Sequence, residues 1–390
     1  MRALARCVAC EDGAVAEPFR AVFSSTPALD ATMTAPIWIL GATGRTGSAV
    51  ARDLHARGLP VTLVGRDRAR LVSLGITGAE IVVAADVRAM IAALANARAS
   101  VVVNTVGPFG AQAIAIARAC PAGTHYVDVA NDAVGCAALL AERVPPKSAW
   151  VTGAGFGFVA TESIVAYLCR DRPPAATVRV TSVPYIATAD NELVGEALAA
   201  TILDALALGG RRYLGGELVR ARFGAALETL TLPDGSVVTS GAAPVGDVVG
   251  AHRASRAPDA IATSGELPTG AAVRIAVPVI ATLLELRPLR RFATRRIAAM
   301  RVPAPKHGRT SSYAHARGTW RDGTVREGWF SCGEAMAFTA ASTGEVAARM
   351  ATQSPPSGAH TPCELYGPDL ALACGATLQP HRASQVARPM

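Results

Sequence analysis

The chain has 390 residues, of which 51% are hydrophobic and 17% are charged. This length allows two or three domains with large buried cores, and the composition excludes a disordered chain, a coiled coil and a small disulfide-stabilised fold. The net charge is +8, but all except two of the 38 basic residues are arginines, a skew that coding bias explains. Because no zinc-finger or RNA-binding motif accompanies this charge, we expect no nucleic-acid partner.

Neither disulfides nor a metal site are expected. The eight cysteines lack framework spacing, and the one C-x-x-C motif, Cys7 and Cys10, has no second pair to complete a tetrahedral site. Residues 1–20 have no unbroken apolar core that a signal peptide would need, and the apolar stretch Ala271–Leu286 is interrupted by Arg274 and Pro278. We therefore expect a cytoplasmic protein without a transmembrane segment.

Neither end of the chain shows a clear helical or strand-like hydrophobic period. We expect residues 1–35 to form a flexible extension, with Met33 as an alternative to Met1 for the start of translation. Residues 376–390 are predicted as a flexible tail, and the polar segment Gln353–His360 as a loop.

From residue 36 to 175, short apolar runs alternate with alanine-rich helical patterns. The predicted strands are Ile37–Leu40, Val61–Val64, Glu80–Ala84, Val101–Asn104, His125–Val127 and Ala149–Thr152. The predicted helices are Thr46–Arg57, Arg68–Leu74, Val87–Asn96, Ala111–Ala119 and Ala133–Arg143. Continuous apolar strands are typical of a parallel sheet with helices on both faces. The pattern predicts the α/β class, with a Rossmann-type, doubly wound parallel sheet.

The pattern changes after Pro173. Residues 176–333 are predicted as an α+β substrate or dimerisation domain with an antiparallel sheet. Its strands are expected at Val178–Tyr185, Arg212–Phe223, Leu227–Thr239, Ser312–Trp320 and Thr324–Phe330, and its long helix at Asp190–Leu208. Asp322-Gly323 between the last two strands is a strong hairpin signal. In residues 334–375, the helix Glu334–Met350 and the segment after it are expected to return to the first domain.

The first predicted strand runs directly into Gly41-Ala42-Thr43-Gly44-Arg45-Thr46-Gly47 and then into a helix. In this G-x-x-G-x-x-G arrangement, Gly41 permits a sharp turn, Gly44 lets a pyrophosphate approach the backbone, and Gly47 lets the helix pack closely on its strand. The helix N-terminus then presents N–H groups and a positive dipole to the phosphates. The motif predicts dinucleotide binding.

The end of the second strand indicates which dinucleotide binds. NAD enzymes place an acidic residue there for the ribose hydroxyls, whereas this chain has Gly65 and Arg66. Arg66 can pair with a 2′-phosphate, with Arg45 as a second cation, so NADP(H) is favoured. Asp67 stays open as a ribose ligand or as a helix cap. The predicted cofactor-binding residues are Gly41, Ala42, Thr43, Gly44, Arg45, Thr46, Gly65, Arg66, Asp86, Val106, Gly107 and Pro108.

Two of these residues have alternatives. Asp86 either meets the adenine or caps the following helix, and the Val106–Pro108 loop either runs under the nicotinamide or is an ordinary strand-to-helix connection. The predicted catalytic residues are Asp128 and Tyr126, at the end of the fifth strand, where a carboxylate can orient substrate or relay a proton. Asp128 has a second reading, in which it bonds backbone or caps a helix, and Tyr126, like His125, has one as a packed strand residue. Glu162 either faces the cleft or sits in the first turn of a helix.

An arginine-rich segment, Arg287–Arg301, follows the apolar stretch. On a surface helix it could meet anionic lipid, coenzyme A phosphates or an acyl carrier protein. The alternative is a buried helix that ends in solvated arginines.

Four motifs together resemble the saccharopine dehydrogenase-like oxidoreductases, a group that includes saccharopine reductases and trans-acting enoyl reductases. They are Gly41–Gly47, Val64–Asp67, Val103–Phe109 and His125–Asp128. The resemblance covers roughly residues 36–375 and implies an NADP-binding Rossmann domain, with an α+β domain that often mediates dimerisation. The segment Ala154–Phe158 departs from the family, because many relatives carry a Cys-Gly-Phe-Asp-Ser-like loop there.

From these observations we expect an NADP(H)-dependent oxidoreductase that transfers hydride to an imine or an activated C=C or C=O of a small-molecule or acyl substrate. Two alternatives stay open. One is a trans-acting enoyl reductase-like partner in lipid or polyketide assembly, with a peripheral membrane or carrier-protein contact. The other is a regulatory protein that binds NADP(H) without turnover.

Overall fold

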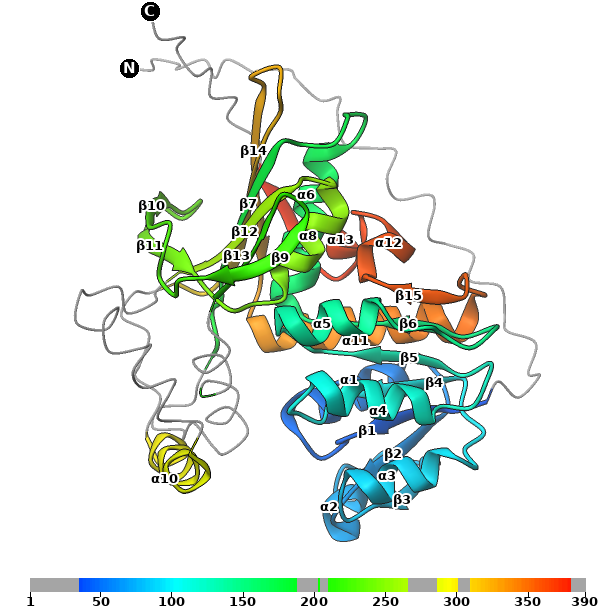
Figure 1. Ribbon diagram of the computed structural model, residues 1–390. Helices are drawn as coiled ribbons and strands as arrows, with labels where there is room; N and C mark the ends of the chain where they lie inside the picture. The colour runs from blue at the N-terminus through cyan, green and yellow to red at the C-terminus, as the bar shows by residue number, and fades with distance from the viewer. Residues whose placement is uncertain (1–34, 188–202, 204–209, 266–285, 301–308, 380–390) are drawn as a thin grey trace, which may run out of the picture. The chain divides into compact units, whose positions relative to one another are not determined.

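The computed structural model describes residues 35–187, 203, 210–265, 286–300 and 309–379, and these residues form two β-sheets (Figure 1). Residues 35–390 group as one unit by their contacts, so the boundaries at 175 and 333 stay predictions. The helix expected at Asp190–Leu208 lies outside the described residues, except for residue 203. At the two ends of the chain, residues 1–34 and 380–390 also lie outside them.

The first sheet is parallel throughout and has the order β15-β6-β5-β4-β1-β2-β3. Its strands are β1 (Ile37–Leu40), β2 (Val61–Gly65), β3 (Glu80–Val83), β4 (Val101–Asn104), β5 (His125–Asp128), β6 (Ala149–Val151) and β15 (Gly358–His360). This is the doubly wound order, and it confirms the predicted Rossmann-type sheet. The loop expected at Gln353–His360 is wrong in its last three residues, because β15 adds a strand beside β6.

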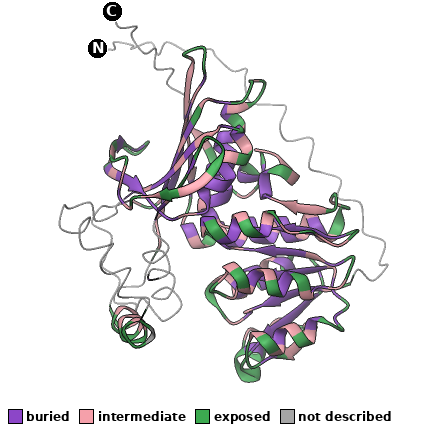
Figure 2. Ribbon diagram, in the orientation of Figure 1, coloured by how far each residue is buried: buried purple, intermediate pink, exposed green. Residues whose placement is uncertain are grey.

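Helices cover both faces of this sheet, which explains why its strands are apolar without alternation. They are α1 (Arg45–Ala56), α2 (Arg68–Val72), α3 (Val87–Leu94), α4 (Gly110–Ala119) and α5 (Ala133–Leu140). Within β1, Ile39 packs in the same buried cluster as Leu54 of α1. Its neighbour Leu40 packs in a second cluster with Ile116 of α4. Figure 2 shows the resulting pattern, with buried strands between helices that are exposed on their outer sides.

The second sheet is mixed rather than antiparallel. Its main path is β10-β11-β12-β7-β13-β14-β16, with β8 beside β12 and β9 beside β8. The strands are β7 (Thr177–Val183), β8 (Gly210–Leu214), β9 (Glu217–Ala221), β10 (Glu228–Thr231), β11 (Val237–Ala242), β12 (Asp259–Gly265), β13 (Ser312–Thr319), β14 (Val325–Cys332) and β16 (Thr377–Gln379). The predicted hairpin at Asp322-Gly323 is confirmed as the β13–β14 pair. The all-antiparallel expectation is wrong, because β7 and β12 run parallel.

One hydrophobic core joins the two sheets. The remaining helices are α6 (Phe156–Cys169), α8 (Asp247–Ser255), α10 (Arg287–Ala298), α11 (Ala335–Thr352), α12 (Pro362–Tyr366) and α13 (Leu370–Ala373). Helix α6 packs on β13 and β14, and α11 packs on α1, β4 and β5. Val127 of the first sheet and Phe330 of the second therefore lie in the same buried cluster.

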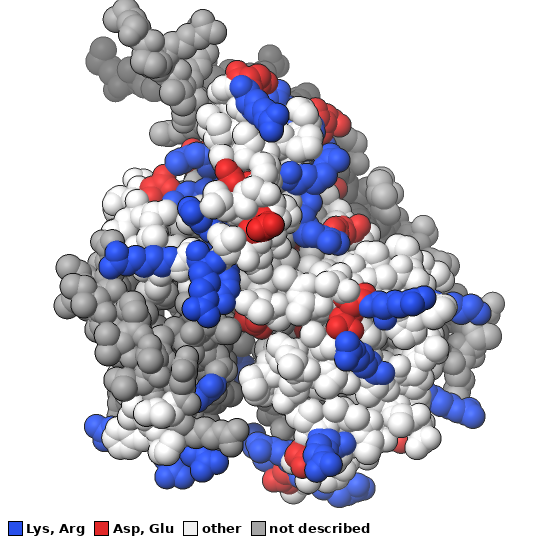
Figure 3. All heavy atoms as spheres, in the orientation of Figure 1, with Lys and Arg blue, Asp and Glu red and all other residues white. Residues whose placement is uncertain are grey.

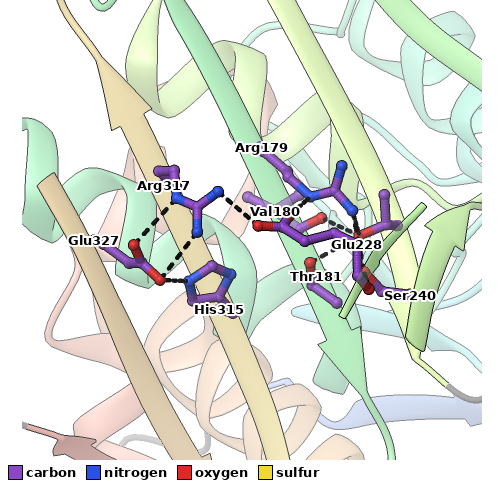
Figure 4. Close-up of polar contacts among 9 residues, drawn as sticks. Arg179, Val180, Thr181, Glu228, Ser240, His315, Arg317 and Glu327 are labelled. Atoms are coloured by element: carbon purple, nitrogen blue, oxygen red, sulfur yellow. Dashed lines mark hydrogen bonds and ion pairs between the residues drawn. The ribbon is translucent and has the colours of Figure 1, made fainter. Parts of the chain in front are cut away.

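The face of the second sheet that carries Arg179 and Arg317 holds a network of charged residues, drawn in Figure 4. Glu228 of β10 pairs with Arg179 of β7 at 2.7 Å and with Arg317 of β13 at 2.6 Å. Glu327 of β14 pairs with Arg317 at 3.1 Å and with His315 at 2.8 Å. The His315 hydrogen bond, followed by the one from Arg317, lowers the pKa of Glu327 to about 2 against the effect of burial. The network links four strands across the sheet.

Candidate functional site

The strands of the parallel sheet end level with one another, so their following loops share one edge. Leu40 is in register with Val64 and with Asn104, and Asn104 is in register with Asp128. The strand order reverses between β1 and β4, and ligands of open parallel sheets bind at such a reversal, beyond the carboxyl ends of the strands. The glycine turn, the Val106–Pro108 loop and Asp128 all lie at this edge.

The glycine turn has the tight geometry that its sequence predicts. Gly41 has a φ of +80°, and a Cβ there would lie 2.8 Å from Thr105 Oγ1. A Cβ on Gly47 would lie 2.3 Å from the Gly41 carbonyl oxygen, so α1 can approach the turn only with glycine at this position. The N–H groups of Gly41 and Ala42 both donate to the Val64 carbonyl, at 3.0 and 3.1 Å. These bonds fix the turn to the end of β2.

The N-terminus of α1 is open toward this edge. Its N-cap residue, Gly44, provides no side-chain cap, and the first turn contains no acidic residue. Within the described part of the chain, the N–H groups of Thr46 and Gly47 donate to no acceptor. Unsatisfied donors at the positive end of a helix dipole form an anion site. Ala42, in contrast, is fully buried and its N–H is already used, so it shapes the turn.

At the end of β2, Gly65 is buried and Arg66 is exposed. No hydrogen bond or ion pair is found between Arg66 and any other residue that the structure describes, so its guanidinium is available to a phosphate. Asp67 caps α2 by accepting from the Arg70 N–H at 3.2 Å, and Asp86 caps α3 by accepting from the Ala89 N–H at 2.9 Å. For both aspartates the structure shows the helix-cap alternative.

The loop after β4 is held in place by its neighbours. The Thr105 hydroxyl donates to the Leu40 carbonyl at 2.7 Å, and the Val106 N–H donates to Asn104 Oδ1 at 3.0 Å. Gly107 and Pro108 are exposed. This anchoring leaves the tip of the loop facing the same edge as the glycine turn.

The sequence suggested that Asp128 and Tyr126 line an open crevice. In the structure both side chains are fully buried. Asp128 Oδ1 accepts from the Thr152 hydroxyl and from two backbone N–H groups, those of Ala130 and Gly153, at 2.8 to 3.2 Å. Its Oδ2 accepts from the Tyr126 hydroxyl at 3.0 Å. Asp128 therefore ties the loops after β5 and β6 together, which matches its backbone-bonding alternative. Burial raises its pKa to about 6, against the effect of these four bonds.

Tyr126 extends this arrangement to the next strand, because its hydroxyl accepts from Asn104 Nδ2 at 3.0 Å. Asn104 in turn holds the Val106 N–H. A chain of side chains thus runs from Asp128 through Tyr126 and Asn104 to the loop under the predicted nicotinamide position. These hydrogen bonds connect the end of β5 to the loop after β4.

Glu162 fits neither of its two predicted roles. It lies in the second turn of α6 and is fully buried. Its carboxyl accepts from the Thr361 hydroxyl and from the Cys363 N–H, so it joins α6 to the start of α12. Burial raises its pKa to about 8. His125 is half-buried and accepts from the Ala149 N–H through Nδ1, as expected for a packed strand residue.

Asp247 is a candidate that sequence reasoning missed. It begins α8 and is fully buried, yet neither carboxylate oxygen has a hydrogen-bond donor in the described structure. A Cβ on Gly157 would lie 2.9 Å from Asp247 Oδ1 and 3.4 Å from Asn131 Nδ2. Asn131 follows β5, and its Oδ1 accepts from the Gly246 N–H at 3.1 Å. The acid therefore lies where the two sheets meet, beside the loop after β5.

Burial raises the pKa of Asp247 to about 6, with smaller opposing effects from the nearby Ser182 hydroxyl and from the backbone N–H of Asp247 itself, neither of which meets hydrogen-bond geometry. Buried polar groups without partners are rare and costly in native proteins. The only sequence signal is an aspartate in a helix-like stretch after Gly246, which does not distinguish it from an ordinary first-turn acid.

Two kinds of structure are absent among the described residues. Among them, no three histidine, cysteine, aspartate or glutamate side chains are grouped to hold a metal ion. None of the helices they form has the length and apolar character needed to cross a membrane.

Comparison with known proteins agrees with this geometry. Residues 37–149 match the family model of the saccharopine dehydrogenase NADP-binding domain. The match confirms the predicted resemblance to saccharopine dehydrogenase-like proteins. It also identifies NADP as the cofactor of this domain. No curated protein sequence matches the chain significantly.

A solved structure shares the fold of both sheets. The chain is similar to apo saccharopine dehydrogenase (L-glutamate forming) from Saccharomyces cerevisiae, with a TM-score of 0.55 and 12% identity over 88% of this chain and 99% of that one. GenD2 from gentamicin A biosynthesis, in complex with NAD, has a TM-score of 0.36 and 15% identity, and the match covers 87% of this chain and 90% of GenD2. Serine dehydrogenase from Escherichia coli has a TM-score of 0.23 and 14% identity, and the match covers 30% of this chain and 80% of that one. Only the first score is high enough to support a shared fold.

Proposed function

We propose that this protein is an NADPH-dependent reductase that reduces an imine or an activated C=C or C=O in a small-molecule or acyl substrate. The observation that carries the proposal is the open N-terminus of α1, which lies over the Gly41–Gly44 turn and has no capping side chain. An exposed arginine, Arg66, follows the neighbouring strand, where an NAD enzyme would carry an acid.

The residues at this edge fit NADP(H). The N–H groups of Thr46 and Gly47 face the pyrophosphate position, and Gly44 leaves its backbone accessible there. Arg66 would pair with the 2′-phosphate, and the Val106–Pro108 loop would contact the nicotinamide half. When bound, the nicotinamide supplies the hydride. The task of the chain is to bind and orient it and to deliver a proton to the substrate.

Asp247 is the group that we assign to the substrate side. Its carboxyl is as fully buried as that of Asp128, but it has no hydrogen-bond donor among the described residues, so a substrate nitrogen or oxygen that reaches it can supply the missing donor. Asp128 and Tyr126 act as positioning residues, because their polar atoms are engaged by the loops that they hold.

A titration with NADPH and NADH tests the cofactor assignment. In Arg66→Ala we expect NADPH binding to weaken by roughly tenfold or more, because a charge-assisted hydrogen bond contributes about 1.5–3 kcal/mol. NADH binding is expected to stay within about twofold, since the molecule has no 2′-phosphate. The control is Arg98→Ala, an exposed arginine that is expected to change neither affinity.

The following results decide between the proposed function and its alternatives. Absence of binding to either nucleotide at millimolar concentration overturns the proposal, and an equal loss of NADPH and NADH affinity in Arg66→Ala overturns the role of Arg66. Tight NADPH binding without turnover of carbonyl, imine or enoyl substrates favours the regulatory alternative. A homodimer, a cytoplasmic location and the enoyl substrate stay predictions.

A further inference from the structure

Helix α10 (Arg287–Ala298) has an unusual composition. The stretch from Leu286 to Met300 contains no acidic residue and five arginines, which are Arg287, Arg290, Arg291, Arg295 and Arg296. Arg291, Arg295 and Arg296 are exposed. In Figure 3 the described atoms at the position of α10 in Figure 1 are blue and white, with no red among them.

The helix and the residues beside its two ends expose large apolar side chains. Phe292 is 62% exposed, more than any other large hydrophobic side chain in the described residues, and Leu286 and Met300 are 59% and 58% exposed. Leu289, which is 37% exposed, lies about 60° from Phe292 around the helix at 100° per residue. Leu286 is the N-cap residue and Met300 follows the C-cap residue, so both lie just outside the helix. Arg290, Arg291 and Arg295 lie on the other side. Arg296 lies within the apolar side, where its long stem can pack while its charge reaches water.

This placement disagrees with the alternative of a buried helix that ends in solvated arginines. A helix with an apolar side, a strongly basic side and no acid is the type that lies in a membrane interface. Coenzyme A phosphates would need a concave site, which an exposed helix does not offer. An acidic carrier protein is the other partner that such a helix could bind, and the test below separates it from a bilayer.

We propose that α10 docks the protein on an anionic lipid bilayer. Phe292 and its apolar neighbours enter the boundary between headgroups and acyl chains, and the arginines pair with lipid phosphates. The net charge of +8 favours the same surface. This inference concerns where the protein works and stands independently of the proposed reductase activity.

Flotation of the full-length protein with vesicles tests the proposal. We expect binding to phosphatidylcholine vesicles that contain about 30% phosphatidylglycerol, little binding to phosphatidylcholine alone, and weakening with added salt. Each basic residue near an anionic surface contributes about 1 kcal/mol, so the triple variant Arg291→Gln, Arg295→Gln, Arg296→Gln should partition roughly 100-fold more weakly. Phe292→Asp tests the apolar side and should also reduce binding.

The matched control carries the same change of charge elsewhere, at the exposed residues Arg98, Arg143 and Arg321, each replaced by glutamine. It should bind like the wild type, and all variants should keep NADPH affinity, which shows that they are folded. Equal binding of the triple variant and the control overturns the proposal, as does failure of the wild type to bind anionic vesicles. A triple variant that changes only the oligomeric state, or only the binding of an acyl carrier protein, assigns the helix to a protein partner and also overturns it.

Discussion

Two buried carboxylates lie near the end of β5, and their surroundings differ. Asp128 accepts four hydrogen bonds, whereas Asp247 accepts none from the described residues. The pKa of each is raised to about 6, chiefly by burial. A satisfied buried acid specifies a local structure, while an unsatisfied one costs stability and is retained where it serves a function.

This contrast predicts different effects of two matched substitutions on the free energy of unfolding. An acid whose pKa is 3.8 when unfolded and about 6 when folded loses stability as the pH rises between these values, because only the folded state still holds the proton. Asp247→Asn removes that cost and should stabilise the protein at pH 7 by on the order of 2 kcal/mol. Near pH 4 the difference should vanish.

Asp128→Asn removes a similar cost at pH 7, because the pKa of Asp128 is also raised to about 6, but it takes the acceptor from the Tyr126 hydroxyl, a loss of about 1–3 kcal/mol. It should therefore stabilise the protein less than Asp247→Asn at pH 7 and destabilise it at pH 4. Urea unfolding of both variants at pH 4 and pH 7 measures these changes. Destabilisation by Asp247→Asn at pH 7 would show that its carboxyl has a partner, and would remove the reason to place substrate there.

At the scale of elements, Glu162 shows how a buried acid joins distant parts of the chain. It lies in α6 and accepts from residues at the start of α12, about 200 positions later. Thr361 and Glu364 cap α12 reciprocally, and the Thr361 N–H follows directly after β15. Glu162 thus adds a buried link between α6 and α12, beside the pairing of β15 with β6 and the ion pair between Arg253 and Glu364.

Glu162 gives the protein a testable pH dependence. Its pKa is about 8 in the folded protein against 4.5 in the unfolded chain, so its contribution to stability is full below pH 4.5 and falls as the pH rises to 8. Between pH 7 and 8 we expect a loss of about 1 kcal/mol. In Glu162→Gln, whose amide can still bond Thr361 and Cys363, this loss should disappear.

Thermal or urea unfolding at pH 7.0, 7.5 and 8.0 follows this slope. The control is Glu217→Gln, an exposed position that should keep the wild-type slope. A slope that persists unchanged in Glu162→Gln would assign it to another group.

The same elements show what the sequence could and could not predict. Strands β1, β2 and β4 are continuous apolar runs bounded by turn residues, so local pattern locates them to within one residue. The three residues of β15 pair with a strand about 200 positions earlier, and local pattern carries no information on such a partner. In the site, the glycine turn is local chemistry and was predictable. The burial of Asp128 and the position of Asp247 depend on packing between distant segments.

At the scale of the whole molecule, the two sheets share one hydrophobic core. Val127 and Phe330 lie in the same buried cluster, and α11 packs on α6 as well as on α1 and the first sheet. The Ala154 carbonyl, after β6, accepts from the hydroxyls of Ser342 and Thr343 in α11, at 2.7 and 3.0 Å. Separation of the sheets would expose this core, so the described residues of the two sheets should unfold as one cooperative unit.

Native-state hydrogen exchange measures this cooperativity without any substitution. Peptides from Val101–Asn104 in the first sheet and from Tyr313–Gly318 in the second should approach the same free energy of opening as urea is added. NADPH at about 100 times its Kd should raise both by about 2.7 kcal/mol, because a ligand of the folded state stabilises every amide that exchanges only through global unfolding. A rise confined to the first sheet, or a lower opening energy in the second, would show two units that unfold separately and would locate a hinge beside the NADP site.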